Sequence, residues 1–365
     1  MDELERARKR INEIDREMAA LFVQRMEASE AVAAYKREHG LPVRDSAREA
    51  EVVRRNAVLV ENETLRAYYV NFLQNNMALS RKYQQRIQEG QTVAYSGVEG
   101  AFAFIAARRI FPDAIHRAYG DFRTAYEAVV SGECDCAVLP IENSYAGEVS
   151  QVIDLLFQGT LYINGVYDLE ITQNLLGLPG TSIADITTVI SHPQALSQCA
   201  EYIRARGFKE VRAANTALAA RQVAEGGDPH VAAIASEDTA VLYGLTLLEK
   251  NINESSTNTT RFAVLSRVED RAELTENGRQ SVLVFTVKNE AGALARAINI
   301  IGGHGFNMRT LRSRPMKELM WQYYFYVETD GNVHSPNGQQ MLKELSGCCD
   351  RLRVVGTFAH ETTLK

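Results

Sequence analysis

The first segment of the chain carries apolar residues at the spacing of an α-helix. Between Asp2 and Glu38 they recur at helical intervals, and the run contains neither glycine nor proline. The apolar positions of this stripe are Leu4, Ile11, Ile14, Met18, Leu21 and Phe22. The pattern predicts a single long helix over this span.

Three cations on this predicted helix lie too far apart to serve one small site. At about 1.5 Å per residue, Arg25 and Lys36 are roughly 16 Å apart on one stripe, where two long side chains can reach the same ligand. Arg8 is about 25 Å from Arg25 and lies on a different face. It can join the site only from a second copy of the chain, which predicts an interlocked dimer with an anion-binding site.

Two further helices are expected before residue 90. The turn at Gly40-Leu41-Pro42 bars continuation of the first helix, and a second helix begins near Asp45 or Ser46, both of which can cap it. A third runs from about 63 to 88 and ends at Gly90. The first segment, 1–90, is therefore predicted to be all-α.

Residues 91–268 change to alternating strands and helices. Short apolar strands end in polar tips and are followed by helices, which is the order of a doubly wound sheet with ligands at the carboxyl ends of its strands. The predicted strands are Thr92–Tyr95, Cys136–Ile141, Thr187–Ser191 and Val231–Ala235. The length allows two α/β lobes with a cleft between them.

The last segment follows a polar stretch at 269–279, which we interpret as a linker. Strands are predicted at 281–288, 307–313, 321–328 and 351–357, with helices at 294–303 and 339–346. This βαββαβ order is the ferredoxin-like arrangement. The aromatic residues of the third strand, Trp321 to Val327, alternate as core and interface positions rather than as a ligand site.

Composition narrows the class of protein. The 365 residues carry a net charge of −6, which argues against bulk nucleic-acid binding, and no apolar run is long enough to span a membrane. The charged N-terminus does not resemble a secretory signal. Five cysteines without Cys-x-x-Cys spacing, and few histidines, predict a reduced cytoplasmic protein without a metal site.

The charged positions of the first segment either form a solvated helical face or bind an anionic ligand. The string Pro42-Val43-Arg44-Asp45, followed by Arg48 and Glu49, resembles the opening of the second helix in the all-helical chorismate mutases. Ser80 and Gln84 are four residues apart and share a face of the third helix. All the binding positions of that family are filled: Arg8, Arg25, Lys36, Asp45, Arg48, Glu49, Ser80 and Gln84.

This resemblance implies the rearrangement of chorismate to prephenate, a pericyclic step that needs no nucleophile and no cofactor. In the family, Lys36 and Gln84 are the donors to the breaking ether oxygen, and Glu49 takes the ring hydroxyl. Arg25, Arg48 and the Arg8 of a second chain hold the two carboxylates. One long helix spans both sites of an intertwined dimer, as the spacing of the cations requires.

The second segment contains an ordered set of motifs that resembles the prephenate dehydratases. They are Leu139-Pro140-Ile141-Glu142-Asn143-Ser144 with Gly147, Ser191-His192-Pro193-Gln194, Ser236-Glu237 with Tyr243-Gly244-Leu245, and Thr260-Arg261-Phe262. The resemblance implies a two-lobed domain over 91–268, like a periplasmic binding protein, that converts prephenate to phenylpyruvate.

Aromatisation drives that reaction, so the protein need only improve the leaving hydroxyl. Thr260 is the family's donor to it, by hydrogen bonding or by proton transfer, and either Glu142 or His192 can instead be the proton source. Asn143, Ser144 and Gln194 are candidate substrate contacts. Arg261 either holds a carboxylate or is structural.

The glycine turn Gly97-Val98-Glu99-Gly100 has the wrong spacing for a dinucleotide fingerprint, which argues against a fused NAD-dependent dehydrogenase. The dehydratase family often has a hydroxyl residue shortly after this turn. Here Ala101 and Ala103 stand instead. A contact from those side chains is therefore lost, and Tyr95 or Ser96 is a candidate to replace it.

The last segment resembles the ACT regulatory domain of these enzymes. Gly292-Ala293-Leu294 and Ser313-Arg314-Pro315 match its motifs, which bind phenylalanine at a subunit interface. The family pattern reads Glu-Ser-Arg-Pro, whereas this chain has Arg312 in place of the glutamate. That exchange reverses a local charge and leaves the strength of regulation open.

The sequence thus predicts a bifunctional chorismate mutase–prephenate dehydratase with a regulatory domain at 280–365. It needs no metal or cofactor, takes chorismate and prephenate as substrates and phenylalanine as effector, and binds neither nucleic acid nor membrane. It is a homodimer or a higher homo-oligomer. One alternative is a monofunctional dehydratase whose helical segment only dimerises. Another is a phenylalanine-responsive binding protein with an inactive cleft.

Overall fold

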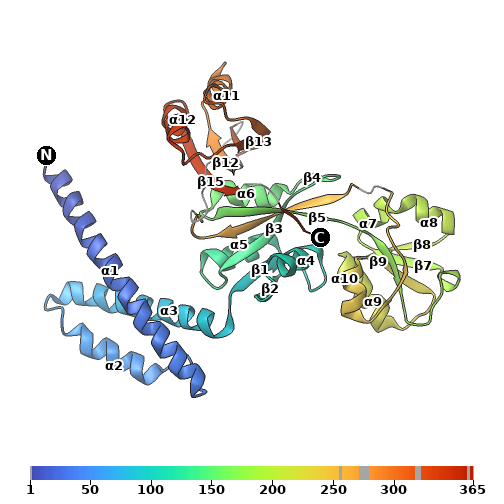
Figure 1. Ribbon diagram of the computed structural model, residues 1–365, viewed down its shortest axis with the longest axis horizontal. Coiled ribbons are helices and arrows are strands. Elements are labelled where there is room, and N and C mark those ends of the chain that lie inside the picture. The colour runs from blue at the N-terminus through green and yellow to red at the C-terminus, as the bar shows by residue number, and fades with distance from the viewer. Residues whose placement is uncertain (1, 255–256, 271–278, 317–321, 360–361, 365) are drawn as a thin grey trace. The chain divides into compact units, whose positions relative to one another are not determined.

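The computed structural model describes residues 2–254, 257–270, 279–316, 322–359 and 362–364. The chain forms two compact units, Met1–Thr92 and Val93–Lys365 (Figure 1). The segment 271–278, within the expected linker, and Trp321 lie outside the described residues. No helix in the described ranges is both long enough and apolar enough to cross a membrane. All five cysteines are free.

The first unit contains the three predicted helices, α1 Glu3–Glu38, α2 Ser46–Ala57 and α3 Glu63–Glu89. Their ends follow from capping chemistry. The Asp45 carboxylate accepts a hydrogen bond from the Arg48 backbone N–H at 2.9 Å, and Asn62 caps α3 in the same way. Gly90 ends α3 with φ 93°, a backbone angle that favours glycine. Both α1 and α2 pack against α3.

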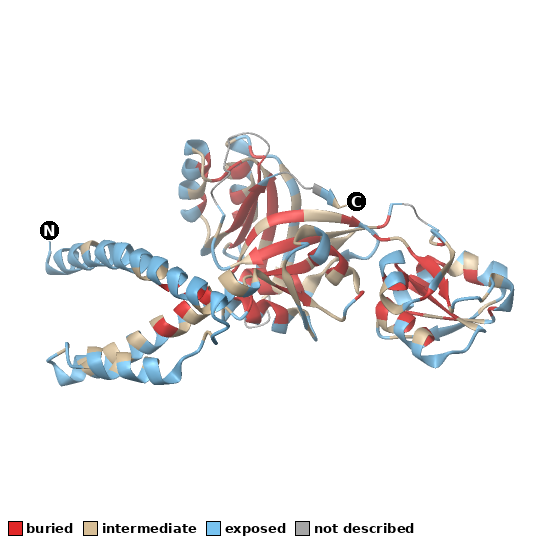
Figure 2. Ribbon diagram, turned by 60° about the horizontal axis from the view of Figure 1, so that its bottom comes forward, coloured by how far each residue is buried: buried red, intermediate tan, exposed pale blue. Residues whose placement is uncertain are grey.

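A single copy of this unit leaves its apolar stripe in solvent. Leu21 on α1 is 63% exposed and Tyr68 on α3 is 72% exposed, and exposed residues run along most of α1 (Figure 2). The buried positions are instead largely small or polar: Ser29, Ala33, Met77, Ser80 and Gln84. An apolar face of this extent is larger than a soluble monomer usually exposes.

In the second unit, the first lobe is a mixed sheet with strand order β16-β5-β11-β3-β1-β2, and β4 pairs with β3. β1 runs parallel to β3, whereas β11 runs antiparallel to both β3 and β5. The strands are β1 Thr92–Ser96, β2 Ile115–Tyr119, β3 Cys136–Asn143, β4 Gly147–Glu148, β5 Tyr162–Glu170, β11 Thr259–Ser266 and β16 Thr362–Leu364. Its helices are α4 Phe102–Ile110, α5 Phe122–Val130 and α6 Ser150–Gln158.

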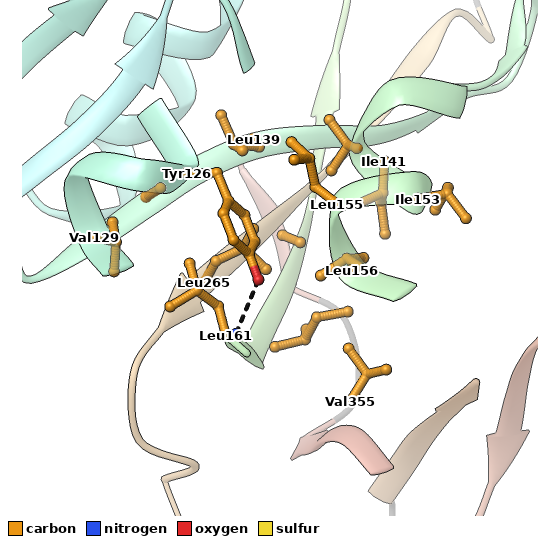
Figure 3. Packing of buried hydrophobic residues seen from close by; sticks show 14 of the residues in the cluster. Tyr126, Val129, Leu139, Ile141, Ile153, Leu155, Leu156, Leu161, Leu265 and Val355 are labelled. Atoms are coloured by element: carbon orange, nitrogen blue, oxygen red, sulfur yellow. Dashed lines mark hydrogen bonds between the residues drawn. The ribbon is translucent and has the colours of Figure 1, made fainter. Parts of the chain in front are cut away.

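The core of this lobe is apolar and closely packed around β3. Figure 3 shows Tyr126 of α5 among Leu139, Leu156 and Leu265, and its hydroxyl accepts a hydrogen bond from the Leu161 backbone N–H at 2.9 Å. A buried tyrosine of this kind adds apolar contact while its polar end is satisfied. The core therefore holds β3 and β11, whose ends carry predicted site residues, on a rigid support.

The second lobe is a five-stranded sheet with the order β10-β6-β9-β7-β8. Its strands are β6 Asn174–Gly177, β7 Thr188–Ser191, β8 Lys209–Arg212, β9 Val231–Ala235 and β10 Thr246–Glu249. Its helices are η1 Ile183–Asp185, α7 Pro193–Gln198, α8 Ala200–Arg206, α9 Thr216–Gly226 and α10 Glu237–Tyr243. The chain leaves the first lobe after β5 and returns to it through β11. The expected two-lobed architecture is thus present.

The last segment has the predicted βαββαβ order, with strands in the order β13-β14-β12-β15. The elements are β12 Arg279–Thr286, α11 Ala293–Gly303, β13 Met308–Pro315, β14 Tyr323–Asp330, α12 Pro336–Ser346 and β15 Arg351–Ala359. Leu283 and Val327 pack toward its helices, whereas Val284 and Tyr326 belong to the core shared with the first lobe. Because both faces are covered, every residue of β12 is buried.

Candidate active sites in the two units

The helical unit gathers most of the predicted mutase residues around α3. The Arg25 guanidinium donates to the Ser80 hydroxyl and, at 3.0 Å, to Asn76 Oδ1. Burial lowers the pKa of Arg25 from its ordinary value. The Lys36 ammonium donates to the Val43 carbonyl oxygen at 2.5 Å, at the turn before α2. Arg25, Lys36 and Ser80 therefore lie at the contacts of α1 with its neighbours.

Gln84 offers an unused polar group inside this unit. Its Nε2 donates to Ser29 Oγ at 2.9 Å, and its Oε1 is buried without a partner among the described residues. A hydroxyl can donate as well as accept. Turning the amide by half a rotation would therefore keep the bond to Ser29 and present Nε2–H at the vacant position, as donation to a ligand oxygen requires.

The remaining mutase positions differ in their surroundings. Glu49 forms an ion pair with Arg81, which is the next residue after Ser80 on α3 and was missed by the sequence reasoning. Arg48 pairs with Glu51 at 2.7 Å on the exposed face of α2. Arg8 lies in the exposed first part of α1. Because α1 is continuous, Arg8 remains about 25 Å along the axis from Arg25 and does not join the other positions within one chain.

The second unit has a cavity of about 470 Å³ between its lobes, and the predicted residues Asn143, His192, Gln194 and Thr260 line it. Asn143 and Thr260 are direct partners in the β3–β11 register. The Asn143 amide donates to Thr260 Oγ1 at 2.9 Å, and its oxygen accepts from the Tyr145 and Ala146 backbone N–H groups. The amide is thus fixed in one orientation. Since Thr260 Oγ1 accepts this bond, its own proton is available to a ligand.

His192 begins α7 and faces the same cavity. Its Nδ1 accepts a hydrogen bond from the Gln194 backbone N–H at 3.2 Å, which assigns the proton of the neutral ring to Nε2. Burial lowers the pKa of His192 below 6.5. The ring is therefore neutral at pH 7 and can donate only through Nε2–H.

Three predicted dehydratase residues do not line the cavity. Glu142 and Arg261 form an ion pair at 3.1 Å, and Arg261 also pairs with Glu328 of β14. The Ser144 hydroxyl donates to the Thr257 carbonyl oxygen and accepts from the Thr259 N–H. These bonds fix the backbone at the start of β11. Of the two candidate proton sources, His192 lies at the cavity and Glu142 does not.

Side-chain amides that the sequence reasoning missed complete the cavity. They are Gln173, Gln198, Asn215 and Asn258. Asn258 is 3% exposed, its Oδ1 accepts from Asn143, and its Nδ2 has no partner among the described residues. A buried amide with a vacant donor is well suited to a ligand oxygen. Asn258 is two residues before Thr260, and this strand-like spacing is the one signal that could have indicated it.

No lysine or arginine of the described chain lines this cavity. Helix N-termini, whose backbone N–H groups can point toward an anion, border it instead. Glu148 also lines the cavity, and its carboxylate is paired with Arg314. α4 begins after Ala101 and α6 after Val149, and neither has a side-chain cap. The small side chains of Ala101 and Ala103 leave the first turn of α4 open. Ser96 also lines the cavity, whereas Tyr95 is buried in the core.

The residues predicted to bind phenylalanine fall on different faces of the C-terminal sheet. Gly292 caps α11 with φ 81°, Ala293 is buried, and Leu294 packs into the helix-covered core. Ser313 pairs with Phe325 on that side of the sheet, and Pro315 ends β13. Arg314 faces the first lobe instead, where it binds Glu148, Ser150 and Asp154. The described residues contain no cluster of histidine, cysteine, aspartate and glutamate suited to a metal ion.

Comparisons with known proteins agree with this division of the chain. Residues 7–85 match the family model of chorismate mutase type II, and residues 93–270 match that of prephenate dehydratase. The chain is 31% identical to the bifunctional chorismate mutase/prephenate dehydratase of Escherichia coli, over 98% of this chain and 96% of that protein. It is 29% identical to the enzyme of the same name from Aquifex aeolicus, over 98% of each.

Two solved structures resemble the second unit. Prephenate dehydratase from Arthrobacter aurescens in complex with L-Phe is 28% identical, with a TM-score of 0.69 over 74% of this chain and 90% of that chain. GqqA, described as a novel type of quorum quenching acylase, is 31% identical, with the same TM-score over 74% of this chain and 98% of that chain. The two family matches and the relatives that span nearly the whole chain show that it belongs to the bifunctional chorismate mutase/prephenate dehydratases.

Proposed function

We propose that this chain converts chorismate to prephenate in its helical unit and prephenate to phenylpyruvate in its two-lobed unit. The observation that carries the proposal is the Asn143–Thr260 pair at the interlobe cavity, in a chain whose mutase positions are also filled. The test supplies purified protein with chorismate and follows prephenate and phenylpyruvate. A protein that consumes prephenate but not chorismate would be the monofunctional alternative, and one that only binds phenylalanine would be the binding protein.

The first step is a rearrangement within one molecule, so the helical unit has to hold a folded conformer and stabilise the charge that grows on the ether oxygen. Arg25 and Arg48 hold carboxylates, and Glu49, oriented by Arg81, takes the ring hydroxyl. Lys36 and the turned amide of Gln84 donate to the ether oxygen. Replacement of Lys36 by alanine should lower the rate of chorismate consumption severely and leave prephenate turnover unchanged.

We propose that the mutase is an intertwined dimer and that Arg8 completes the site of the second chain. The distance along α1 and the exposed stripe on α1 and α3 support this proposal. The test mixes Arg8→Ala chains with Lys36→Ala chains under conditions that exchange subunits. In a shared-site hybrid, one of the two sites is intact, so about a quarter of the wild-type activity should return at equal mixing. If each site lies within one chain, no activity returns.

The second step needs a donor at the leaving hydroxyl. The carbon–carbon bond to the ring carboxylate breaks and its electrons enter the ring, while the carbon–oxygen bond of the ring hydroxyl breaks. Carbon dioxide leaves, and the hydroxide takes one proton to form water. Thr260 donates a hydrogen bond to that hydroxyl, and the neutral His192 offers Nε2–H as a second donor. The amides of Asn258 and Gln194 and the open helix N-termini receive the carboxylates of the dianion.

The geometry at Thr260 favours this chemistry over acyl transfer, the class of reaction that the description of GqqA as an acylase implies. A threonine nucleophile needs a base that removes its proton. The partner of Thr260 Oγ1 is the Asn143 amide, which donates a hydrogen bond and does not accept a proton. The arrangement therefore leaves Thr260 as a donor to the substrate.

We further propose that phenylalanine binds the C-terminal sheet and inhibits the dehydratase. Support comes from the L-Phe complex of the Arthrobacter aurescens relative and from Gly292, which has no side chain and so leaves the N-terminus of α11 without a side-chain cap. Titration calorimetry with phenylalanine, together with the rate of prephenate turnover, tests this. Neither heat nor inhibition at millimolar phenylalanine would contradict the proposal.

A further inference from the structure

An ionic network lies behind the catalytic end of β3 and β11. It also includes Glu148 of β4, which lines the cavity and whose Oε2 lies 3.9 Å from Arg312 Nη1. The two oxygens of the Glu142 carboxylate have different partners. Oε1 accepts from Arg312 of β13, and Oε2 accepts from Arg261 at 3.1 Å. Arg261 also donates at 3.0 Å to Glu328 of β14. The carboxylate is therefore held between the catalytic strands and the C-terminal sheet.

Strand geometry places this network next to the reacting groups. Glu142 and Arg261 are register partners, and the adjacent register pair is Asn143 and Thr260. Since successive side chains of a strand point to opposite faces, the ionic pair faces the C-terminal sheet while the amide and the hydroxyl face the cavity. Any movement that lets Glu142 shift along β3 also shifts Asn143, which orients Thr260.

These pairs are shielded from solvent more than surface pairs are. The side chains of Arg261 and Arg312 are 16% and 19% exposed, and that of Glu328 is 3% exposed. Charge-assisted hydrogen bonds in such surroundings are short and directional, and loss of one partner leaves the other charge poorly solvated. The network is thus able to fix the position of a strand end.

The residue at position 312 decides whether this contact attracts or repels. The resembling family pattern has a glutamate there, and a glutamate on β13 would face the Glu142 carboxylate with a like charge. In this chain, arginine makes the contact attractive. Its neighbour Arg314 extends the same face of β13 to Glu148 and Asp154.

We propose that Arg312 is a positioning residue of the dehydratase: through Glu142 it holds the end of β3 so that Asn143 presents the Thr260 hydroxyl to the substrate. The proposal rests on the dehydratase activity proposed above. It assigns to the C-terminal sheet a direct part in the reaction, besides any effector binding. Because Arg312 and Glu142 do not line the cavity, they act on the rate of the chemical step rather than on affinity.

The test measures prephenate turnover by full-length variants of the chain. They are Arg312→Gln, Arg312→Lys, Glu142→Gln and the double variant that combines Arg312→Gln with Glu142→Gln. Displacement of reacting groups by a fraction of an ångström lowers rates steeply, so kcat should fall about tenfold in Arg312→Gln with KM changed by less than about twofold. Arg312→Lys keeps the charge and should recover part of the rate. The double variant should be no slower than Glu142→Gln alone, because both substitutions remove the same contact, that between Arg312 and Glu142.

Two controls separate positioning from general damage. Arg309 lies on the same strand as Arg312 and pairs with Asp330 of β14, away from β3. Arg309→Gln removes that pair and should leave kcat unchanged. Mutase activity of each variant measures the amount of enzyme, and urea unfolding shows whether the second unit, which carries the substitution, is folded. If Arg312→Gln fails to fold, Glu142→Gln decides in its place by the same criterion.

Wild-type kcat in Arg312→Gln or Glu142→Gln would overturn the inference. So would multiplicative losses in the double variant, or a raised KM with kcat unchanged. Absence of prephenate turnover in the unsubstituted protein would contradict the proposed function itself, and is thus distinguishable from failure of the inference.

Discussion

Thr260→Val keeps the shape of the side chain but removes the hydroxyl that we propose donates a hydrogen bond to the leaving hydroxyl of prephenate. The structural cost should be small. The Asn143 amide, which loses an acceptor, still donates to Asn258 Oδ1 at 2.8 Å and to the Thr259 carbonyl oxygen at 3.2 Å. The change should therefore be felt mainly in the transition state. Loss of one preorganised donor costs about 2.7–4 kcal/mol, which is about 10²–10³ in kcat.

The assay follows phenylpyruvate from saturating prephenate in parallel with mutase activity and thermal unfolding. Thr260→Ser keeps the hydroxyl and should stay within about tenfold of the wild type. Thr259→Val makes the same change one residue earlier, on the other side of β11, and should leave kcat unaltered. A Thr260→Val variant that folds normally and retains kcat within threefold of the wild type would remove Thr260 from the reaction.

Three further predictions concern other groups. Gln84→Leu, which cannot donate to the ether oxygen, should lower mutase kcat by about 10²–10³ and leave prephenate turnover unchanged; equal mutase rates would contradict its role. Because burial lowers the pKa of His192, its ring stays neutral as pH falls through 6.5, and dehydratase kcat should stay level across that pH. The same shift predicts that the free energy of urea unfolding falls as pH drops below 6.5, because His192 takes up a proton in the unfolded chain at a higher pH than in the folded chain. His192→Gln should weaken this pH dependence. Asn258→Ala should raise KM for prephenate by about tenfold; an unchanged KM would exclude substrate contact.

The sequence predicted features whose cause is local. Asp45 marks the start of α2 and Gly90 marks the end of α3. Both were predictable because a capping carboxylate and a residue with positive φ act within one turn of helix. The βαββαβ order of the last segment was predictable because apolar residues recur with different periods in strands and in helices. Asn143 and Gln194 were predictable as cavity residues from their positions after strands, where ligands collect in open α/β sheets. His192 and Thr260 were indicated by the family resemblance, and Thr260 reaches the cavity because β11 runs antiparallel to β3.

Features that depend on long-range packing were not predictable. Alternation assigns Arg261 and Thr260 to opposite faces, but only the docked C-terminal sheet shows that Arg261 meets Glu328 rather than substrate. Gln173 carries no motif that distinguishes it from other polar loop residues, and only its spacing from Thr260 indicates Asn258. The burial of β12 on both faces likewise arises because the first lobe covers the sheet face that its own helices leave open.

The most direct measurement of the central claim is a time course of chorismate, prephenate and phenylpyruvate in one reaction with the purified chain. We predict that phenylpyruvate accumulates to the amount of chorismate consumed. Thr260→Val should stop at prephenate, and Lys36→Ala should leave chorismate intact while still converting added prephenate. A wild-type protein that consumes chorismate yet leaves prephenate unreacted, or that converts neither, would contradict the account.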